Sequence, residues 1–128
     1  MSRLTPARIE DHWQAIRPCL DKVQTKAPAR WSPDDVYAAC VEGRAFLFVC
    51  PEGFCILRPL AGSVTTVQVW IVYGEGDSLI TRYEPEIERL AREIGARRLV
   101  FTSTRPGYRR VMRRWSRDGN DYERYIHE

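Results

Sequence analysis

The stretch from Val72 to Ser78, VYGEGDS, contains two glycines at a spacing that could serve to bind an anion. Gly74 and Gly76 are two positions apart, and glycines so placed let the backbone turn sharply and leave amide groups uncovered. The stretch continues a run of β-branched and aromatic residues, VTTVQVWIV, and precedes a segment with helical spacing. A loop between a strand and the start of a helix is a place where backbone amides hold phosphate. The same residues suit an ordinary tight turn, so the pattern alone predicts either a phosphate cradle or a turn.

The cysteines and histidines do not form a metal-binding pattern. The four cysteines have no CxxC spacing, and the two histidines lie at opposite ends of the chain. These residues are Cys19, Cys40, Cys50, Cys55, His12 and His127. Cys50 and Cys55 could face each other across a hairpin, but in a reducing compartment buried free thiols are the expected state. We therefore expect no metal site and assign the cysteines no chemistry.

The composition is that of one ordinary globular domain over residues 1–128. Hydrophobic residues make up 44% of the chain and charged residues 29%, with no biased tract. No run is long and apolar enough for a membrane span, and the first residues lack the apolar stretch of a secretory signal. We therefore expect a cytoplasmic protein with no membrane partner. The formal net charge of +3 is too small to indicate nucleic acid.

The first half of the chain contains signals for two helices. Residues 9–23 carry apolar side chains at spacings of three and four, the stripe of an amphipathic helix, which Pro18 could kink or divide. Ser32 fits the N-cap of a second helix that begins with Pro33 and ends at Gly43. Acidic residues in the first turn of this second helix favour the same boundary.

Apolar and β-branched runs predict six strands in one mixed sheet. The expected strands lie near residues 3–6, 46–50, 54–60, 64–73, 98–103 and 121–128. Short turns separate the second, third and fourth strands, so these three should form an antiparallel meander. A helix lies between the fourth and fifth strands, and a helical crossover within one sheet makes its two strands parallel.

Two further helices are expected in the second half. Residues 79–95 keep one apolar face in phase across Pro85, which predicts a single helix capped by Asp77 or Ser78; a helix that starts at Pro85 is the alternative. The arginine-rich segment 105–115, RPGYRRVMRRW, also has helical spacing. Its residues expected to face the core are Val111, Met112 and Trp115.

The resulting order is strand, two helices, three strands, helix, strand, helix, strand. With a strand that runs into a glycine-containing loop and a helix that ends REIGARRLVF, this order resembles the Gcn5-related N-acetyltransferase (GNAT) family over nearly the whole chain. The resemblance implies an α/β fold with a mixed α+β sheet, the acyl-CoA N-acyltransferase-like fold. It also implies acetyl-CoA as co-substrate and direct attack by the amine of a small molecule or protein, with no covalent enzyme intermediate.

The resemblance also implies where acetyl-CoA binds. In the family the central strand splays from its neighbour, and the loop after it, with the pattern glutamine or arginine, two residues, glycine, one residue, glycine or alanine, binds the pyrophosphate. The pattern falls on Ile71 to Gly76, with Ile71 in place of the polar residue. The binding residues implied are Val69, Trp70, Ile71, Val72, Tyr73, Gly74, Glu75, Gly76, Asp77 and Ser78. Glu75 and Asp77 bring negative charge toward a pyrophosphate, so weaker binding than is usual in the family is expected.

Two residues are candidates for proton transfer. Family members often carry a tyrosine in the helix after the fifth strand that protonates the departing thiolate, but Met112 stands near that position and cannot serve as an acid. Tyr108, one turn earlier, is the candidate acid. Family members use a glutamate or a bound water as base toward the amine, and Glu42 is the candidate glutamate.

A second hypothesis comes from the segment TSTRPGYRR. It is similar to stretches in short members of this fold from bacteriophage and prophage genomes, which implies an alternative role as an inactive virion, assembly or binding protein with phage structural partners. The arginines of the same segment offer a third hypothesis, nucleic acid binding, which ranks lower because the preceding helix is rich in glutamate.

Overall fold

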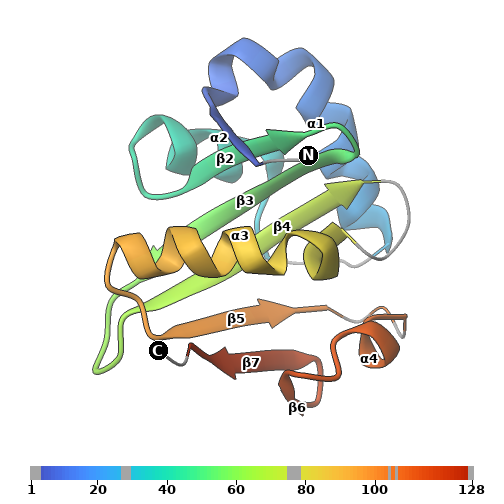
Figure 1. Cartoon of the computed structure of the whole chain (residues 1–128). Coiled ribbons are helices and arrows are strands. Elements are labelled where there is room, and N and C mark those ends of the chain that lie inside the picture. Colours follow the sequence, from blue (N-terminus) through green and yellow to red (C-terminus); the bar gives the residue numbers. More distant parts are fainter. Residues whose placement is uncertain (1–3, 27–29, 75–78, 104, 106, 127–128) are drawn as a thin grey trace.

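A computed structural model of the protein describes residues 4–26, 30–74, 79–103, 105 and 107–126, and shows one mixed sheet with helices on both faces (Figure 1). The elements in chain order are β1 (Thr5–Ala7), α1 (Ile9–Lys26), α2 (Pro33–Val41), β2 (Phe46–Cys50), β3 (Gly53–Leu60), β4 (Thr66–Gly74), α3 (Leu79–Glu93), β5 (Arg98–Thr102), α4 (Gly107–Val111), β6 (Ser116–Asp118) and β7 (Asp121–Tyr125). None of the helices in these ranges is both long and apolar enough to cross a membrane.

The strand order confirms the predicted topology. The sheet runs β1-β2-β3-β4-β5-β7-β6, and β1 to β4 pair antiparallel. Among the described strands the parallel pair is β4 with β5, between which α3 forms the crossover. The register within the hairpin of β2 and β3 sets Cys55 opposite Phe48 and Cys50 opposite Gly53. Cys50 and Cys55 therefore do not face each other, and all four cysteines are free thiols.

A β-bulge interrupts β4 near its middle. Leu57 of β3 lies opposite Val69, but the preceding residue, Ile56, lies opposite Ile71, which leaves Trp70 as the extra residue. A bulge bends its strand and shifts the alternation of side chains by one position. As a result Val69 belongs to the core under α3, whereas Trp70 and Ile71 both pack on the side of α1 and α2.

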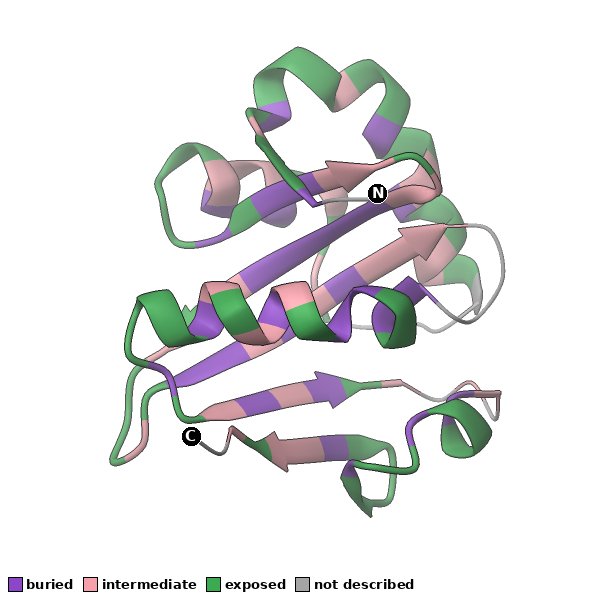
Figure 2. Ribbon diagram, viewed as in Figure 1, coloured by how far each residue is buried: buried purple, intermediate pink, exposed green. Residues whose placement is uncertain are grey.

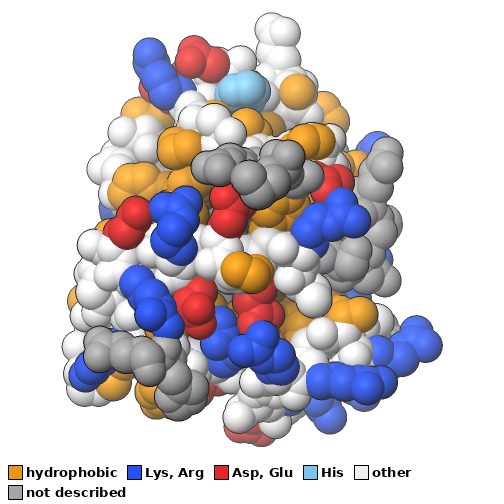
Figure 3. Space-filling model, viewed as in Figure 1, with side chains coloured by type: hydrophobic (Ala, Val, Ile, Leu, Met, Phe, Trp, Pro, Cys, Tyr) orange, Lys and Arg blue, Asp and Glu red, His pale blue; other side chains and the backbone are white. Residues whose placement is uncertain are grey.

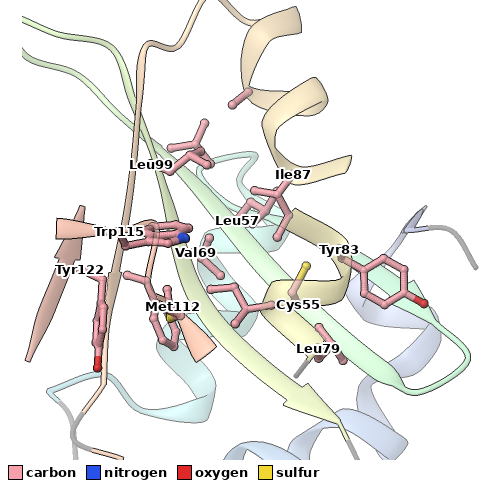
Figure 4. Packing of buried hydrophobic residues seen from close by; sticks show 14 of the residues in the cluster. Cys55, Leu57, Val69, Leu79, Tyr83, Ile87, Leu99, Met112, Trp115 and Tyr122 are labelled. Carbon is pink, nitrogen blue, oxygen red and sulfur yellow. The ribbon is translucent and has the colours of Figure 1, made fainter. Parts of the chain in front are cut away.

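Two hydrophobic cores flank the sheet, one on each face. Buried positions alternate with exposed ones along α3, as expected for a helix with one face on the sheet (Figure 2). The core under α3 contains Val69, Ile87 and Leu99 and continues toward the C-terminal strands through Trp115 and Tyr122 (Figure 4). The other core packs α1 and α2 on the sheet. Its helical members are Ile9, Ile16, Leu20, Val36 and Ala39. The predicted stripe of α1 is thus confirmed, and the helix continues past Pro18.

The ends of α2 and the course of α3 follow from local chemistry. Ser32 caps α2, since its hydroxyl accepts from the Asp35 amide while the Asp35 carboxylate accepts from the Ser32 amide. Helix α3 starts before Pro85 and runs through it, so the alternative start at Pro85 is wrong. The predicted caps of α3, Asp77 and Ser78, lie outside the described residues.

The C-terminal region differs from the prediction. The helix expected over residues 105–115 ends at Val111, which is 38% exposed, while Met112 and Trp115 are buried in the core as predicted. After the turn that follows, β6 and β7 form a hairpin whose two-residue loop is Gly119–Asn120. Gly119 has a φ of +63°, a conformation that glycine adopts without strain in such loops. The strand β6 was not predicted, although the sequence RDGND contains this turn signal.

A buried ion pair joins this hairpin to α3. Arg124 Nε of β7 lies 3.0 Å from Glu84 Oε2, and its Nη2 donates to Glu88 Oε1 at 2.8 Å. Trp115 Nε1 donates to the other oxygen of Glu84 at 2.9 Å. The Arg124 and Glu84 side chains are only 10% and 11% exposed. Each charge in this cluster is therefore compensated by a neighbour rather than by water.

Another close contact fastens the turn between β2 and β3 to the start of α3. The Tyr83 hydroxyl donates to Glu52 Oε1 at 2.6 Å, and Arg82 pairs with the same carboxylate. Gly74 lies close to both segments, next to Glu52 of the turn and Leu79 of α3. A Cβ on Gly74 would stand 2.4 Å from Leu79 Cδ1 and 3.0 Å from the Glu52 carbonyl oxygen. The backbone of Gly74 does not have a positive φ, so lack of space is what excludes a side chain there.

The ion pair predicts a large loss of stability for Arg124→Met. The change leaves Glu84 buried without its cation, which typically costs about 3 kcal/mol of unfolding free energy. The control is Arg89→Met on the exposed face of α3, where the pair with Glu93 is more than half exposed and should contribute less than about 0.5 kcal/mol. Urea unfolding measures the loss of unfolding free energy in each variant. Equal, small losses would contradict the role given to Arg124.

The close approach at Gly74 predicts that Gly74→Ala destabilises the protein. The added methyl must displace a buried leucine or the neighbouring turn, and overpacking of this kind costs about 1–3 kcal/mol. Gly62→Ala is the matched control, because a Cβ there meets only the Val64 carbonyl oxygen at 3.8 Å. The comparison is made by thermal and urea unfolding. A Gly74→Ala protein as stable as Gly62→Ala would show that the turn and α3 can move apart without cost.

Candidate functional site

The parallel strands β4 and β5 separate partway along their length. Their pairing covers four positions, from Thr66 opposite Arg98 to Val69 opposite Phe101. Beyond it β4 continues to Gly74, whereas β5 ends at Thr102. No described strand pairs with β4 on that side after Val69, so this edge of the backbone is available to a ligand.

A cavity of about 120 Å³ lies at this separation. It is bounded by the end of α1, the segment before α2, the second half of β4, the end of β5 and α4. The residues that line it are Lys22, Val23, Trp31, Trp70, Ile71, Val72, Tyr73, Gly74, Phe101, Thr102, Ser103, Arg105 and Tyr108. The predicted binding residues from Trp70 to Gly74 are among them. Val69 is not, because the bulge leaves its side chain in the core under α3.

The rest of the predicted phosphate loop, Glu75, Gly76, Asp77 and Ser78, lies outside the described residues. Ile71, at the position where the loop pattern has a polar residue, is 2% exposed and packs in the core beneath α1 and α2. This position of the motif therefore contributes no polar side chain to the cavity.

The described lining of the cavity is positively charged. Lys22 and Arg105 contribute cations, and no described lining residue carries a carboxylate. The Arg105 guanidinium carbon lies 5.8 Å from the centroid of the Tyr108 ring. Cations around a concave, partly enclosed site favour an anionic ligand, because low-dielectric walls strengthen the field there.

Tyr108 is the predicted catalytic residue that reaches the cavity. It belongs to α4, is 5% exposed, and its ring stands edge-on to Phe101, with centroids 5.0 Å apart and planes at 78°. Met112, the residue near the family's tyrosine position, is buried in the core and does not line the cavity. Among the described lining residues, Tyr73 and Tyr108 carry phenolic hydroxyls, and such a group can donate a proton.

The other predicted catalytic residue, Glu42, lies elsewhere. It forms the C-cap of α2, and its carboxylate is 58% exposed and 2.9 Å from Arg44 Nε. It is not among the residues that line the cavity. The geometry thus brings Tyr108 together with β4 but does not bring Glu42 to the same place.

Two of the thiols, Cys40 and Cys55, are poor nucleophiles in this fold. Burial raises the pKa of Cys40 to about 11. Burial also raises the pKa of Cys55 well above its ordinary value. Both remain protonated at neutral pH, and no cysteine lines the cavity. Within the described ranges, no three His, Cys, Asp or Glu side chains gather where they could hold a metal ion.

The arginine-rich segment contributes Arg105 and Tyr108 to the cavity wall, and its other arginines lie beside the site. Basic side chains gather at the end of the molecule where α4 and β6 lie (Figure 3). The exposed arginines there are Arg109, Arg110, Arg113, Arg114 and Arg117. Arg113 and Arg117 donate to backbone carbonyls, and within the described part of the chain none of the five pairs with a carboxylate. Within the described residues this face is therefore exposed to solvent and not paired with acids.

Sequence reasoning missed several residues of the cavity wall. Lys22 and Val23 were predicted only as part of a helix, and Thr102 and Ser103 only as the end of a strand. No linear spacing relates these residues to β4, since they meet it only when α1 packs on the sheet and β5 turns away. Trp31 also lines the cavity.

Comparison with known proteins identifies the fold. No family model matches the sequence, and none of the curated proteins matches it. Solved structures do match. PaiA N-acetyltransferase from Thermoplasma acidophilum, in complex with coenzyme A, is 12% identical, with a TM-score of 0.68 over 98% of this chain and 99% of that one. A GNAT family acetyltransferase from Brucella melitensis, in complex with acetyl-CoA, is 16% identical, with a TM-score of 0.66 over 100% of this chain and 90% of that one.

A third structure, an acetyltransferase from Thermus thermophilus, is 18% identical, with a TM-score of 0.58 over 98% of this chain and 97% of that one. At these identities the likeness concerns the fold. The mixed sheet, its strand order and the separation of β4 from β5 agree with it. The chain therefore has the acyl-CoA N-acyltransferase fold of the Gcn5-related N-acetyltransferases.

Proposed function

We propose that this protein is an N-acetyltransferase that transfers the acetyl group of acetyl-CoA to an amine. The observation that carries the proposal is the cavity at the separation of β4 and β5, with an unpaired strand edge on one side and cations at its wall. In the reaction the amine nitrogen bonds to the acetyl carbon, the carbon–sulfur bond breaks, the nitrogen loses a proton and the thiolate gains one. Coenzyme A supplies the activated thioester.

The residues present fit a coenzyme A molecule. The free edge of β4 over Trp70 to Gly74 offers backbone donors and acceptors, and an extended chain with amide groups can pair with such an edge as a strand does. Lys22 and Arg105 would attract its phosphates. The binding residues proposed are those from Val69 to Ser78, of which Val69 acts only through the backbone.

Within this proposal Tyr108 donates the proton that the departing thiolate needs. Its ring is held by Phe101, which limits the positions that the hydroxyl can take. The amine is proposed to lose its proton to water. Glu42 is not used as a base, because its carboxylate pairs with Arg44 outside the cavity lining. The amine attacks directly, since no thiol lines the cavity.

The alternative is a binding or assembly role without catalysis, with a phage or prophage origin and a location in a virion. One observation favours it: Ile71 puts a buried apolar side chain where the loop pattern has a polar one. Both hypotheses use the same fold, and they differ in whether acetyl-CoA binds at the cavity.

Calorimetric titration with acetyl-CoA separates the two hypotheses. The unmodified chain should bind one equivalent, and Lys22→Glu should weaken binding about tenfold, because it replaces a cation at the cavity by an anion. Arg17→Glu is the matched control, an equal charge change at an exposed position of α1 outside the lining, and should change the affinity less than about twofold. Absence of binding by the unmodified chain would contradict the proposal and favour the assembly role.

The role given to Tyr108 predicts that Tyr108→Phe lowers kcat by about 100-fold, the smaller end of the usual contribution of a general acid. The affinity for acetyl-CoA should stay within about twofold, since the ring and its contact with Phe101 remain. Tyr125→Phe, at a tyrosine that is 45% exposed, is the control and should have unaltered kinetics. Steady-state assays measure kcat, and calorimetry measures the affinity for acetyl-CoA. Normal kcat in Tyr108→Phe would remove the tyrosine from the mechanism.

A further inference from the structure

A second hollow lies beside the cavity, on the face of the sheet that α2 covers. It is open, with a volume of about 410 Å³. The charged and aromatic side chains that line it are Arg30, Arg44, Arg58, Asp35, Trp31 and Trp70. We call it the arginine groove. Trp31 and Trp70 line both the arginine groove and the cavity, so the two spaces share a wall.

Arg58 is the most fixed cation of the arginine groove. It stands opposite Gln68 in the register of β3 and β4, and its Nε and Nη2 both donate to Gln68 Oε1, at 2.9 Å and 2.6 Å. Its guanidinium carbon lies 4.1 Å from the centroid of the Trp70 ring, within the range of a cation–π contact. Two contacts therefore hold the guanidinium in one orientation before any ligand arrives.

The contacts of Arg58 leave part of its guanidinium unused. Gln68 occupies the side of the fork formed by Nε and Nη2, and the end formed by the two terminal nitrogens has no partner among the described residues. That end presents two parallel N–H groups, the geometry that matches the two oxygens of a carboxylate. Burial, and secondarily the charge of Arg44, lower the pKa of Arg58, which reports a cation that lacks a compensating anion.

The acids near the arginine groove do not neutralise it. Asp35 is the single acid of the described lining, against three arginines, and its Oδ2 accepts from the Ser32 amide at the cap of α2. Glu42 pairs with Arg44 at the exposed edge. Neither carboxylate forms a pair with Arg58. Among the described residues the groove therefore has an excess of positive charge. The two terminal nitrogens of Arg58 are held in one orientation there without a carboxylate partner.

The bulge in β4 lies where the two spaces meet. The Trp70 side chain lies on the same face of the sheet as Arg58 and Gln68, and the backbone from this extra residue onward forms the free edge of β4. A small molecule with its anionic end on Arg58 would pass over the indole of Trp70 to reach the cavity. The amine end of such a molecule would then lie at the cavity proposed for acetyl-CoA.

We propose that the acceptor is a small amine that carries a carboxylate, and that Arg58 binds this carboxylate in the arginine groove. This inference rests on the proposed acetyltransferase function and adds the class of acceptor. Arg58 is a specificity-determining residue in this proposal: it takes no part in proton transfer and selects the acceptor by charge and by the shape of the carboxylate.

The first test compares amino acids with their amides as acceptors, since each pair differs only in the carboxylate. The acids should be acetylated with KM values at least tenfold lower than those of the amides, and Arg58→Gln should remove this difference while the affinity for acetyl-CoA, measured by calorimetry, stays within twofold. Arg17→Gln, an exposed arginine outside both spaces, is the control. Equal KM values for acids and amides in the unmodified enzyme would overturn the inference and leave the acetyltransferase function standing.

The second test needs no turnover. N-acetylated amino acids, titrated without coenzyme A, should produce a saturable change in tryptophan fluorescence, because Trp31 and Trp70 line the groove. The change should be lost in Arg58→Gln and weakened about threefold in Arg44→Gln, an exposed position whose replacement leaves the packing on Trp70 intact. Tighter binding of O-phosphoethanolamine than of the carboxylates would overturn the carboxylate assignment. Failure of acetyl-CoA to bind, with carboxylate binding retained, would overturn the proposed function instead.

Discussion

The structure depends on the early end of pairing between the two parallel strands β4 and β5. Two local features force it. On one strand the bulge at Trp70 bends the backbone immediately after the last paired residue, Val69. On the other, the chain after Phe101 is tied to the C-terminal hairpin, since the Thr102 hydroxyl donates to Asp121 and the Ser103 amide donates to the Asn120 carbonyl. Each strand is thus drawn to a different neighbour, and a cavity results.

The C-terminal wall of that cavity is held in place from outside the site. Tyr108 sits on a helix of five residues, too short to be stable alone. Its position depends on the core beneath it, where Met112 and Trp115 are buried and the Trp115 indole donates to Glu84 of α3. A buried ion pair far from the cavity in sequence therefore supports the side chain that the proposed reaction uses.

The sequence predicted the parts of the fold that follow from local patterns and from rules of strand connection. Alternation and turn residues defined the meander, and the helix between β4 and β5 required their parallel pairing. The end of α4 was not predicted, because a hydrogen bond from Trp115 to a residue 31 positions away overrides helical spacing. The hairpin of β6 and β7 was missed despite a local signal at Gly119. Part of the cavity wall was predicted, because residues 70–74 follow one another along a single strand. Lys22 and Ser103 were not predicted as wall residues, because they reach the cavity only through tertiary packing.

The bulge also bears on which ligands the protein can accommodate. In a regular strand the alternation from Val69, which lies in the core under α3, would leave Trp70 on the face of α1 and α2 and turn Ile71 into the core under α3. With one extra residue, both side chains point to the face of α1 and α2, where the indole contacts Arg58 and lines both hollows. Trp70 thus lies where β4 and β5 separate, between the cations of the cavity and those of the arginine groove. A protein that joins an anionic donor to an anionic acceptor must keep two like charges apart while their reacting ends meet, and an aromatic wall between two basic hollows provides that separation without adding charge.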